Sequence, residues 1–393
     1  MKRWLVLLLA VFLGGQALAE EPMKTLHVQG DDAFWRAHPE IPHEEAWYAA
    51  ETDALTMLLE TQADAVFLAL YNDELQPLLA AEALADLSGS DSLMAEAARM
   101  HPWVRQLVTD EAGRLRALPV SAILRPVYWY QDAWDAAGLT AADVPTSFEE
   151  LLDFLDAWAK APRPGVCVSH MIRFNTGKAQ YNYGAWLLEM LLSAHEMQQR
   201  HAGERVDFET EAFIRLAERA RETGLALYRA ESKLAGEKKL QLFQSDLAGG
   251  EHANNGRPEG LSHTVPLRLT ADQPALTYAA VEVVALRAGT PWLAEGLALL
   301  EHLAGRQAWW RQYSLYADFA PGEYAYEGSS RVGCVDAGWL ADYAAYEGEI
   351  VAYPRALYQR REGPETKNRL ILQFMAGDIA APALAKGLNA ALE

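Results

Sequence analysis

The sequence predicts an α/β protein, because apolar runs of strand type alternate with amphipathic runs of helix type. Residues 63–70, ADAVFLAL, form a continuous apolar stretch between polar residues, which is typical of a strand buried in a parallel sheet. Residues 71–89 return to a helical pattern that ends at Gly89. Strand followed by helix, repeated along one chain, is the order found in α/β folds.

Length and charge narrow the class of protein further. A chain of 393 residues exceeds what one simple core supports, so two or three domains are expected. Hydrophobic residues make up 51% and charged residues 22%, as in ordinary soluble globular proteins. The net charge is -20 and no sustained basic run occurs. A nucleic-acid partner is therefore not expected, since it needs clustered Lys and Arg.

Residues 1–19 have the pattern of a secretory signal peptide. Lys2 and Arg3 precede an apolar run over residues 4–13, and small residues ending in the motif ALA follow up to position 19. We expect an exported protein, periplasmic or extracellular and soluble, whose mature chain begins near Glu20. The apolar run is shorter than the roughly 20 residues of a membrane span. No cysteine lies near the cleavage point, so no lipid anchor is predicted.

The two cysteines, Cys167 and Cys334, lie far apart in the sequence. Export permits a disulfide between them, and two buried free thiols are the alternative. Neither cysteine has the spacing of a metal ligand.

The first half of the chain divides into elements at clear local signals. Strands are predicted over residues 24–30, 63–70, 115–118 and 127–130, with Pro119 after the third of them. A helix over residues 131–137 is expected to end at Gly138. The next helix has Thr146 or Ser147 as its N-cap, and its apolar stripe consists of Phe148, Leu151, Leu152, Leu155 and Trp158.

The second half continues the alternation. Strands are predicted over residues 165–170, 239–246 and 277–286, and the Gly- and Asn-rich residues 247–260 form a loop by composition. Long amphipathic helices are expected in residues 182–200 and 208–225. Another helix runs from Pro291 to Gly305, and two more close the chain near residues 365–375 and 381–392.

Residues 118–158 resemble the extracellular solute-binding proteins of ABC importers, in the sugar-binding, maltose-binding-protein-like group. The stretches LPVSAILRPVYWYQDAWDAAGL and VPTSFEELLDFLDAW carry the resemblance. Gln131 stands where the family usually has Asn. The matching residues are Pro119, Val120, Tyr128, Tyr130, Asp132, Gly138, Leu139, Pro145, Thr146, Phe148, Glu149 and Leu151.

The resemblance implies a two-lobed periplasmic-binding-protein fold of type II, with a hinge and a ligand cleft between the lobes. The N-terminal lobe would comprise residues 20–121 and 274–320, and the C-terminal lobe residues 122–273 and 321–393. The chain would cross between them near Ser121 and again within residues 270–279. A ligand would favour the closed arrangement because it makes better contacts there.

Sugar sites combine aromatic platforms with planar hydrogen-bonding groups, and open α/β sheets bind ligands at the carboxyl ends of their strands. Trp129 is a further candidate, because strand alternation sets its ring on the opposite face from Tyr128 and Tyr130. For each candidate a packing role is the alternative. The predicted ligand-binding residues are Asp31, Asp32, Trp35, Tyr71, Asn72, Asp73, Trp129, Arg173, Asn175, Tyr183, Asn254, Asn255, Trp309, Trp310 and Tyr316.

Signatures of catalysis are missing from the sequence. It has no G-x-S-x-G, H-E-x-x-H, P-loop or G-x-G-x-x-G motif. His38 and His43 flank Glu40, but prolines at positions 39 and 42 interrupt that segment, and its spacing fits no common metal site. We expect no metal and no cofactor.

The sequence therefore predicts a monomeric substrate-binding component of an ABC importer. It would capture a small polar solute, which we expect to be a carbohydrate, and deliver it to a membrane permease. Two alternatives stay open: an exported glycosidase, and a diverged binding protein that serves a sensor. Polyamines and phosphate esters stay open as solutes.

Overall fold

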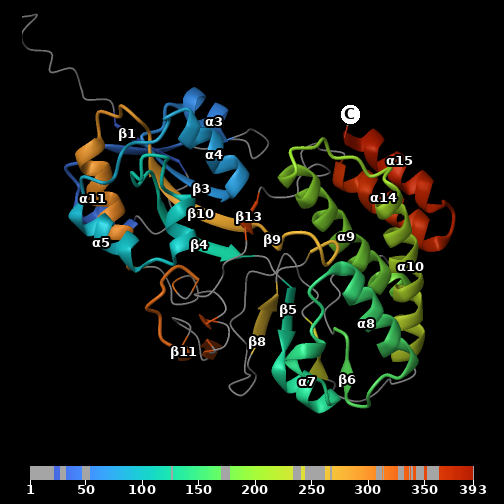
Figure 1. Cartoon of the computed structure of the whole chain (residues 1–393). Helices are drawn as coiled ribbons and strands as arrows, with labels where there is room; N and C mark the ends of the chain where they lie inside the picture. The colour runs from blue at the N-terminus through green and yellow to red at the C-terminus, as the bar shows by residue number, and fades with distance from the viewer. Residues whose placement is uncertain are drawn as a thin grey trace, which may run out of the picture.

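The computed structural model shows two lobes side by side (Figure 1). It describes residues 22–26, 32–46, 54–124, 127–169, 178–232, 240–243, 262–265, 268–306, 312, 314–325, 332–335, 337, 340–341, 349–351 and 363–392. The predicted signal peptide over residues 1–19 lies outside them. Within these ranges, no helix is long and apolar enough to cross a membrane.

The first lobe is built on a five-stranded mixed sheet. Its order is β2 (His43–Ala46), β1 (Met23–Leu26), β3 (Ala65–Tyr71), β10 (Ala279–Leu286) and β4 (Leu118–Leu124). Strand β1 pairs parallel with β2 and β3, whereas β10 pairs antiparallel with both β3 and β4. The edge strand β2 was not predicted, because its HEEA sequence is polar and His43, Glu44 and Glu45 are exposed.

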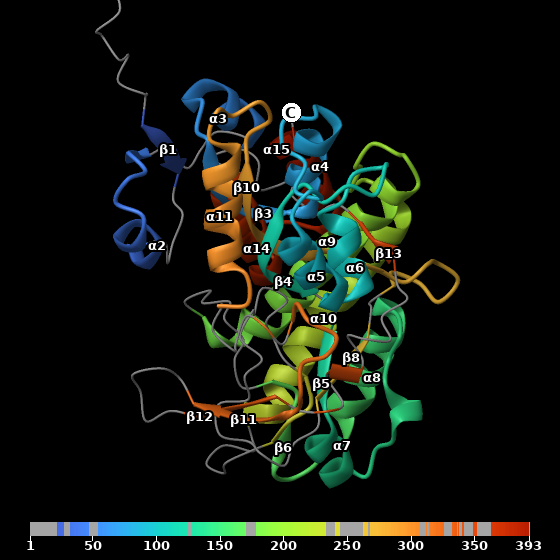
Figure 2. The same ribbon diagram turned by 90° about the vertical axis from the view of Figure 1, so that its left-hand side faces the viewer.

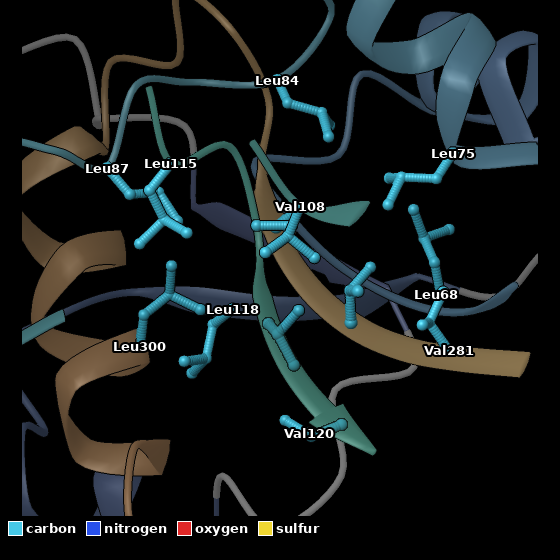
Figure 3. Packing of buried hydrophobic residues seen from close by; sticks show 14 of the residues in the cluster. Leu68, Leu75, Leu84, Leu87, Val108, Leu115, Leu118, Val120, Val281 and Leu300 are labelled. Atoms are coloured by element: carbon cyan, nitrogen blue, oxygen red, sulfur yellow. The ribbon is translucent and has the colours of Figure 1, made fainter. Parts of the chain in front are cut away.

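Helices surround this sheet. They are α2 (Asp32–Ala37), α3 (Ala54–Thr61), α4 (Asn72–Ala80), α5 (Asp91–Arg99), α6 (Pro102–Leu107) and α11 (Leu293–Leu303). Helix α11 contacts both β10 and α5, and it lies in front of the sheet in Figure 2. Side chains from β3, β4, β10 and α11 belong to one core, in which Leu118 lies near Leu300 and Leu68 lies near Val281 (Figure 3).

Strand β4 differs from its prediction. The expected strand ended before Pro119, but β4 runs through Pro119 to Leu124. The proline is tolerated because β4 is an edge strand, and because the register with β10 shifts between Glu282 and Val283. Leu115 makes only an isolated bridge to Thr109.

The second lobe is mainly helical. Its helices are α7 (Gln131–Ala137), α8 (Phe148–Lys160), α9 (Asn182–His201), α10 (Glu211–Glu231), α14 (Gly363–Ala376) and α15 (Ala381–Leu392). Two short strand pairs join them: β5 (Val127–Tyr130) with β8 (Ser262–Val265), and β6 (Val166–Cys167) with β7 (Leu240–Gln241). An antiparallel bridge from Trp129 to Phe243 connects the two pairs.

Local sequence signals explain where α8 begins and where α7 ends. Ser147 caps α8 by accepting a hydrogen bond from the Glu150 N–H at 3.2 Å, and the Glu150 carboxylate completes the capping box. All five residues of the predicted apolar stripe of α8 are buried. Gly138 ends α7 in the left-handed conformation, with φ of 71°. These predictions are confirmed.

Helices α9 and α10 approach each other closely at two glycines. A methyl group on Gly224 would overlap the backbone nitrogen and Cα of Gly184. Because both contacting atoms belong to backbone, no side-chain rotation can relieve the overlap. The absence of a side chain at Gly224 therefore permits the close approach of the two helices, whereas a methyl group on Gly184 would instead meet the Met375 side chain of α14.

The described residues bracket two places where the chain crosses between the lobes. Leu124 belongs to the first core and Trp129 to the second, so β4 leads directly into β5 across the boundary. The chain returns between Leu269, in the second core, and Ala279, in the first. Strand β9 (Leu276–Thr277) lies on this return and pairs parallel with β13 (Glu349–Ile350).

The C-terminal region is shared between the lobes. Val335 of β12 (Val332–Val335), which pairs with β11 (Gly322–Ala325), is part of the first core, and Ile350 packs against it. Residues 321–393 are all predicted to belong to the second lobe. Among the described residues of that range, those buried in the second core belong to α14 and α15. The exact boundary between the lobes in this region stays a prediction.

Cys167 is a buried free thiol. The side chain of Cys334 lies outside the described residues. In this structure Cys167 therefore takes no part in the disulfide that export would permit.

Replacing Gly224 by alanine should destabilise the second lobe. Alanine normally favours a helix over glycine by about 1 kcal/mol, but the overlap with Gly184 should reverse this and cost about 3 kcal/mol. Urea unfolding measures the change. Gly387→Ala is the control, since its methyl group would meet the flexible Leu370 side chain at 2.8 Å. Equal decreases in the free energy of unfolding of the two variants would contradict the close approach of α9 and α10.

Asp110 should make stability depend on pH in acid. Its carboxylate accepts the Arg114 N–H at 2.9 Å and side-chain bonds from Arg114 and Arg116, and these bonds lower its pKa from 3.8 to about 2. Because the Asp110 pKa is lower in the folded state, the ionised side chain stabilises the fold at pH values above the unfolded pKa of 3.8. This stabilisation is lost as the pH falls through about 2. The stability difference between wild type and Asp110→Asn should therefore shrink between pH 4 and pH 2. Urea midpoints across this range measure it, and a constant difference would refute the assignment.

Candidate functional site

Strand direction places the carboxyl end of β3 beside the junction between the lobes. Strand β4 ends at Leu124, where the chain passes to the second lobe. Strand β10 is antiparallel to β4, and β3 is antiparallel to β10, so β3 and β4 run the same way. Tyr71 and Ile123 both pair with Ala280. Tyr71, the last residue of β3, thus lies at the edge from which the chain leaves the first lobe.

Strand directions also show which end of the second lobe faces the first. Strand β5 runs away from the junction, and the bridge from Trp129 to Phe243 is antiparallel. Because β6 is parallel to β7, the carboxyl ends of β6 and β7 lie at the end where β5 begins. Val168 and Ser169, which follow β6, are therefore on the side of the first lobe. Strand ends of both lobes meet at one junction, which is where open α/β sheets bind ligands.

Several predicted ligand residues follow, in the sequence, the strands that end at this junction. Their side chains lie outside the described residues. Tyr71 ends β3, and Asn72 and Asp73 open α4. Asp32 opens α2, and its side chain is likewise not described. Asp31, Arg173, Asn175, Asn254, Asn255, Trp309 and Trp310 lie outside the described residues altogether. Their contact with a ligand stays a prediction.

Two predicted aromatic residues are buried in the first lobe. The Trp35 ring stacks on His43, with ring centroids 4.1 Å apart. Tyr316 is 1% exposed, and the Arg99 guanidinium lies 4.5 Å from the centre of its ring. Burial raises the pKa of the Tyr316 hydroxyl. Both rings pack in the interior in this structure.

Two more predicted rings are buried in the second lobe. Trp129 is 6% exposed and meets Trp134 edge-on, with centroids 5.3 Å apart. Tyr183 donates its hydroxyl hydrogen to Glu231. Burial, and then the charge of Glu231, raise the pKa of Tyr183. Alternation along a strand shows that neighbouring rings face opposite ways, but it does not show that both faces are covered.

Glu231 was not among the predicted residues. It is the last residue of α10 and is buried, and its carboxylate accepts hydrogen bonds from the Val168 N–H at 2.7 Å and the Trp158 indole N–H at 3.3 Å as well as from Tyr183. No local signal marks it in the sequence, because a glutamate near the end of an amphipathic helix usually faces solvent.

A cavity of about 530 Å³ lies between η2 (Ala179–Tyr181) and α14. It adjoins Lys178, the first described residue after the predicted ligand residues Arg173 and Asn175. The Lys178 ammonium lies 5.5 Å from the centre of the Tyr181 ring. An aromatic ring beside planar polar groups is the combination that sugars require. The lining residues are Lys178, Tyr181, Glu365, Asn368, Arg369, Leu372, Gln373, Ala376 and Asp378.

A second cavity, of about 630 Å³, opens at the other end of the first sheet, near the amino ends of β1 and β3. At its floor Asp64 accepts hydrogen bonds from Thr290 at 2.7 Å and Arg287 at 3.1 Å. The Lys24 N–H also donates to Asp64, at 2.9 Å. These contacts hold the start of β3 to the end of β10, so the polar groups here are used by the fold.

The described side chains were compared with the pattern of a metal site. Over that part of the chain, no three His, Cys, Asp or Glu residues gather as metal ligands would. His38 instead pairs with Glu40 at 3.1 Å on the surface.

Comparison with known proteins gives structural relatives only. No family model matches the sequence, and no curated protein matches it. The structure is similar to binding protein MsmE of Bacillus subtilis in an open conformation, with TM-score 0.57, 12% identity, and coverage of 95% of this chain and 96% of that one.

Two further structures agree over almost the whole chain. A sugar transporter protein of Bacillus licheniformis in complex with stachyose has TM-score 0.53 and 12% identity, covering 94% of this chain and 98% of that one. A periplasmic solute-binding protein of Pectobacterium atrosepticum has TM-score 0.53 and 13% identity, with the same coverage. The predicted fold is thus confirmed: this chain has the two-lobed α/β architecture, type II, that these solute-binding proteins share.

Proposed function

We propose that this protein is the substrate-binding component of an ABC importer, which captures a carbohydrate between its lobes and delivers it to a membrane permease. One observation carries the proposal: strand ends of both lobes meet at a single junction that the chain crosses repeatedly. A ligand held there contacts both lobes at once. Its binding energy then favours the closed arrangement over the open one.

The carbohydrate class is supported by similar structures and by the chemistry at the junction. Structures with this fold include one in complex with stachyose and one in complex with raffinose, the latter with TM-score 0.50 and 15% identity. The proposed ligand residues at the strand ends are Tyr71, Asn72 and Asp73 in the first lobe, and Arg173, Asn175, Asn254 and Asn255 in the second. Tyr181, which lines the cavity between η2 and α14, is proposed as an aromatic surface for the sugar.

We propose lobes close to those predicted, with β11, β12 and β13 moved to the first lobe, where Val335 and Ile350 pack. The signal-peptide pattern of residues 1–19 supports export to the periplasm or outside the cell. We propose that the exported protein is soluble and monomeric. The permease is the partner that this function requires.

Sugar binding is tested by thermal shift against raffinose, stachyose, xylo-oligosaccharides, maltose and non-sugar solutes such as polyamines. A ligand that binds only the folded state at a concentration of 100 times its Kd should stabilise the protein by about 2.7 kcal/mol. We expect a raised Tm with at least one sugar, stoichiometric binding by calorimetry and no product by chromatography. Product formation would establish a glycosidase instead, and a shift with a polyamine alone would overturn the carbohydrate class.

The Tyr181 ring is tested by Tyr181→Ala. Removal of an aromatic platform for a sugar should weaken binding about tenfold, a change of about 1.4 kcal/mol. Tyr228→Ala is the matched control, because Tyr228 packs against the same core from α10 without lining the cavity. Calorimetric Kd values with the sugar found above measure both. Equal effects in the two variants would remove Tyr181 from the proposed site.

A further inference from the structure

His195 is a buried histidine of α9 that contacts the connection between α9 and α10, residues 202–210. The residue is 4% exposed, and its Nε2 lies 2.8 Å from the Asp207 carbonyl oxygen. Because a carbonyl oxygen only accepts hydrogen bonds, Nε2 carries a proton. The other ring nitrogen, Nδ1, is buried and has no hydrogen-bond partner among the described residues. Neutral His195 therefore has its one proton at Nε2 and a bare lone pair at Nδ1.

The same connection is bound to α9 and α15 by two amide side chains. Gln199, one turn after His195, accepts from the Asp207 N–H at 2.7 Å and donates to the Asp207 carbonyl oxygen at 3.2 Å. Asn389 of α15 accepts from the Phe208 N–H at 2.8 Å and donates to the Asp207 carboxylate at 2.6 Å. The backbone of Asp207 and Phe208 is thus a point at which α9, the chain leading into α10, and α15 are joined.

The surroundings of the His195 ring are apolar. Its centroid lies 5.6 Å from that of Phe208 and 5.1 Å from that of Phe213, and both phenylalanines are fully buried. The charged groups that act on the ring are Asp207 and Glu204, two exposed acids of the connection. Phe213 on α10 and the α15 amide described above are uncharged.

A second proton on this ring is unfavourable. It would add at Nδ1, where the described residues offer no acceptor, and it would bring a positive charge into an apolar environment. Burial accordingly lowers the pKa of His195 below its usual 6.5, although the bond to the Asp207 carbonyl and the charges of Asp207 and Glu204 act in the opposite direction. The unfolded chain therefore takes up this proton more readily than the folded protein does.

We infer that His195 is an acid-sensitive latch of the second lobe. As a neutral ring it holds the connection between α9 and α10 in place. Once protonated it releases that connection, together with the contact to α15, because only then do the new N–H and the charge reach water. The latch needs no ligand, so it is independent of the proposed sugar-binding function and goes beyond it.

Urea unfolding of wild type and His195→Gln at about pH 7.5 and about pH 5 tests the latch. Glutamine can keep an N–H donor toward Asp207, but it does not titrate. Because the pKa of His195 is lowered on folding, its contribution to stability is complete above the unfolded pKa of 6.5 and is lost as the pH falls below that value. The ratio of folded to unfolded protein should therefore fall about tenfold more in wild type than in His195→Gln. His38→Gln is the control, since His38 is a surface residue paired with Glu40, and this variant should follow wild type.

Hydrogen exchange shows whether the release is local. The amides of Asp207 and Phe208, which donate to side chains of α9 and α15, should lose protection about tenfold in wild type over the same pH range, and not in His195→Gln. The Leu242 amide of the same lobe, which donates to the Cys167 carbonyl oxygen at 2.8 Å, should keep its protection factor in both proteins.

The outcomes decide the inference without a sugar. An equal fall of stability in wild type and His195→Gln would overturn it, and so would a loss of protection at Leu242 as large as that at Asp207. Should His195→Gln not fold, an NMR titration of the His195 ring in wild type takes its place. A midpoint below 6.5 supports the latch, and a midpoint at or above 6.5 would overturn it.

Discussion

Strand β10 pairs antiparallel with both β3 and β4, and the rest of the structure depends on that pairing. It forces β3 and β4 to run in the same direction, so that both end at the junction with the second lobe. It also returns the chain to the first lobe after more than 150 residues spent elsewhere, counting from Leu124 to Ala279. The discontinuous lobes, the repeated crossings between them and the common edge at which β3 and β4 end all follow from one interior strand of a sheet.

Much of this fold could be predicted from the sequence, because its signals are local. The apolar run of β3, the cap of α8 at Ser147 and the left-handed Gly138 each need only a few neighbouring residues. Strand β2 lacked such a signal, since an exposed edge strand has no apolar face to reveal it. Pro119 misled the prediction because a proline interrupts a central strand but is accepted at an edge.

The candidate site was harder to predict, because its contacts are long-range. The rule on strand ends selected Tyr71 and its neighbours, whose contact with a ligand stays a prediction, and the same list included Trp35, Trp129, Tyr183 and Tyr316, which are buried. The sequence alone does not distinguish an aromatic ring that packs in a core from one that contacts a ligand. Glu231 escaped notice for a related reason: its donors are 48, 63 and 73 residues away along the chain.

The late return of β10 also governs the order in which the molecule can assemble. A chain that has grown as far as residue 278 holds β3 and β4 but not the strand that joins them, and it lacks α14 and α15 of the other lobe. Neither lobe can close its core until the last third of the chain is present. Contacts of such high sequence separation slow folding, so the complete core of each lobe forms late, after the segments between its parts have been made.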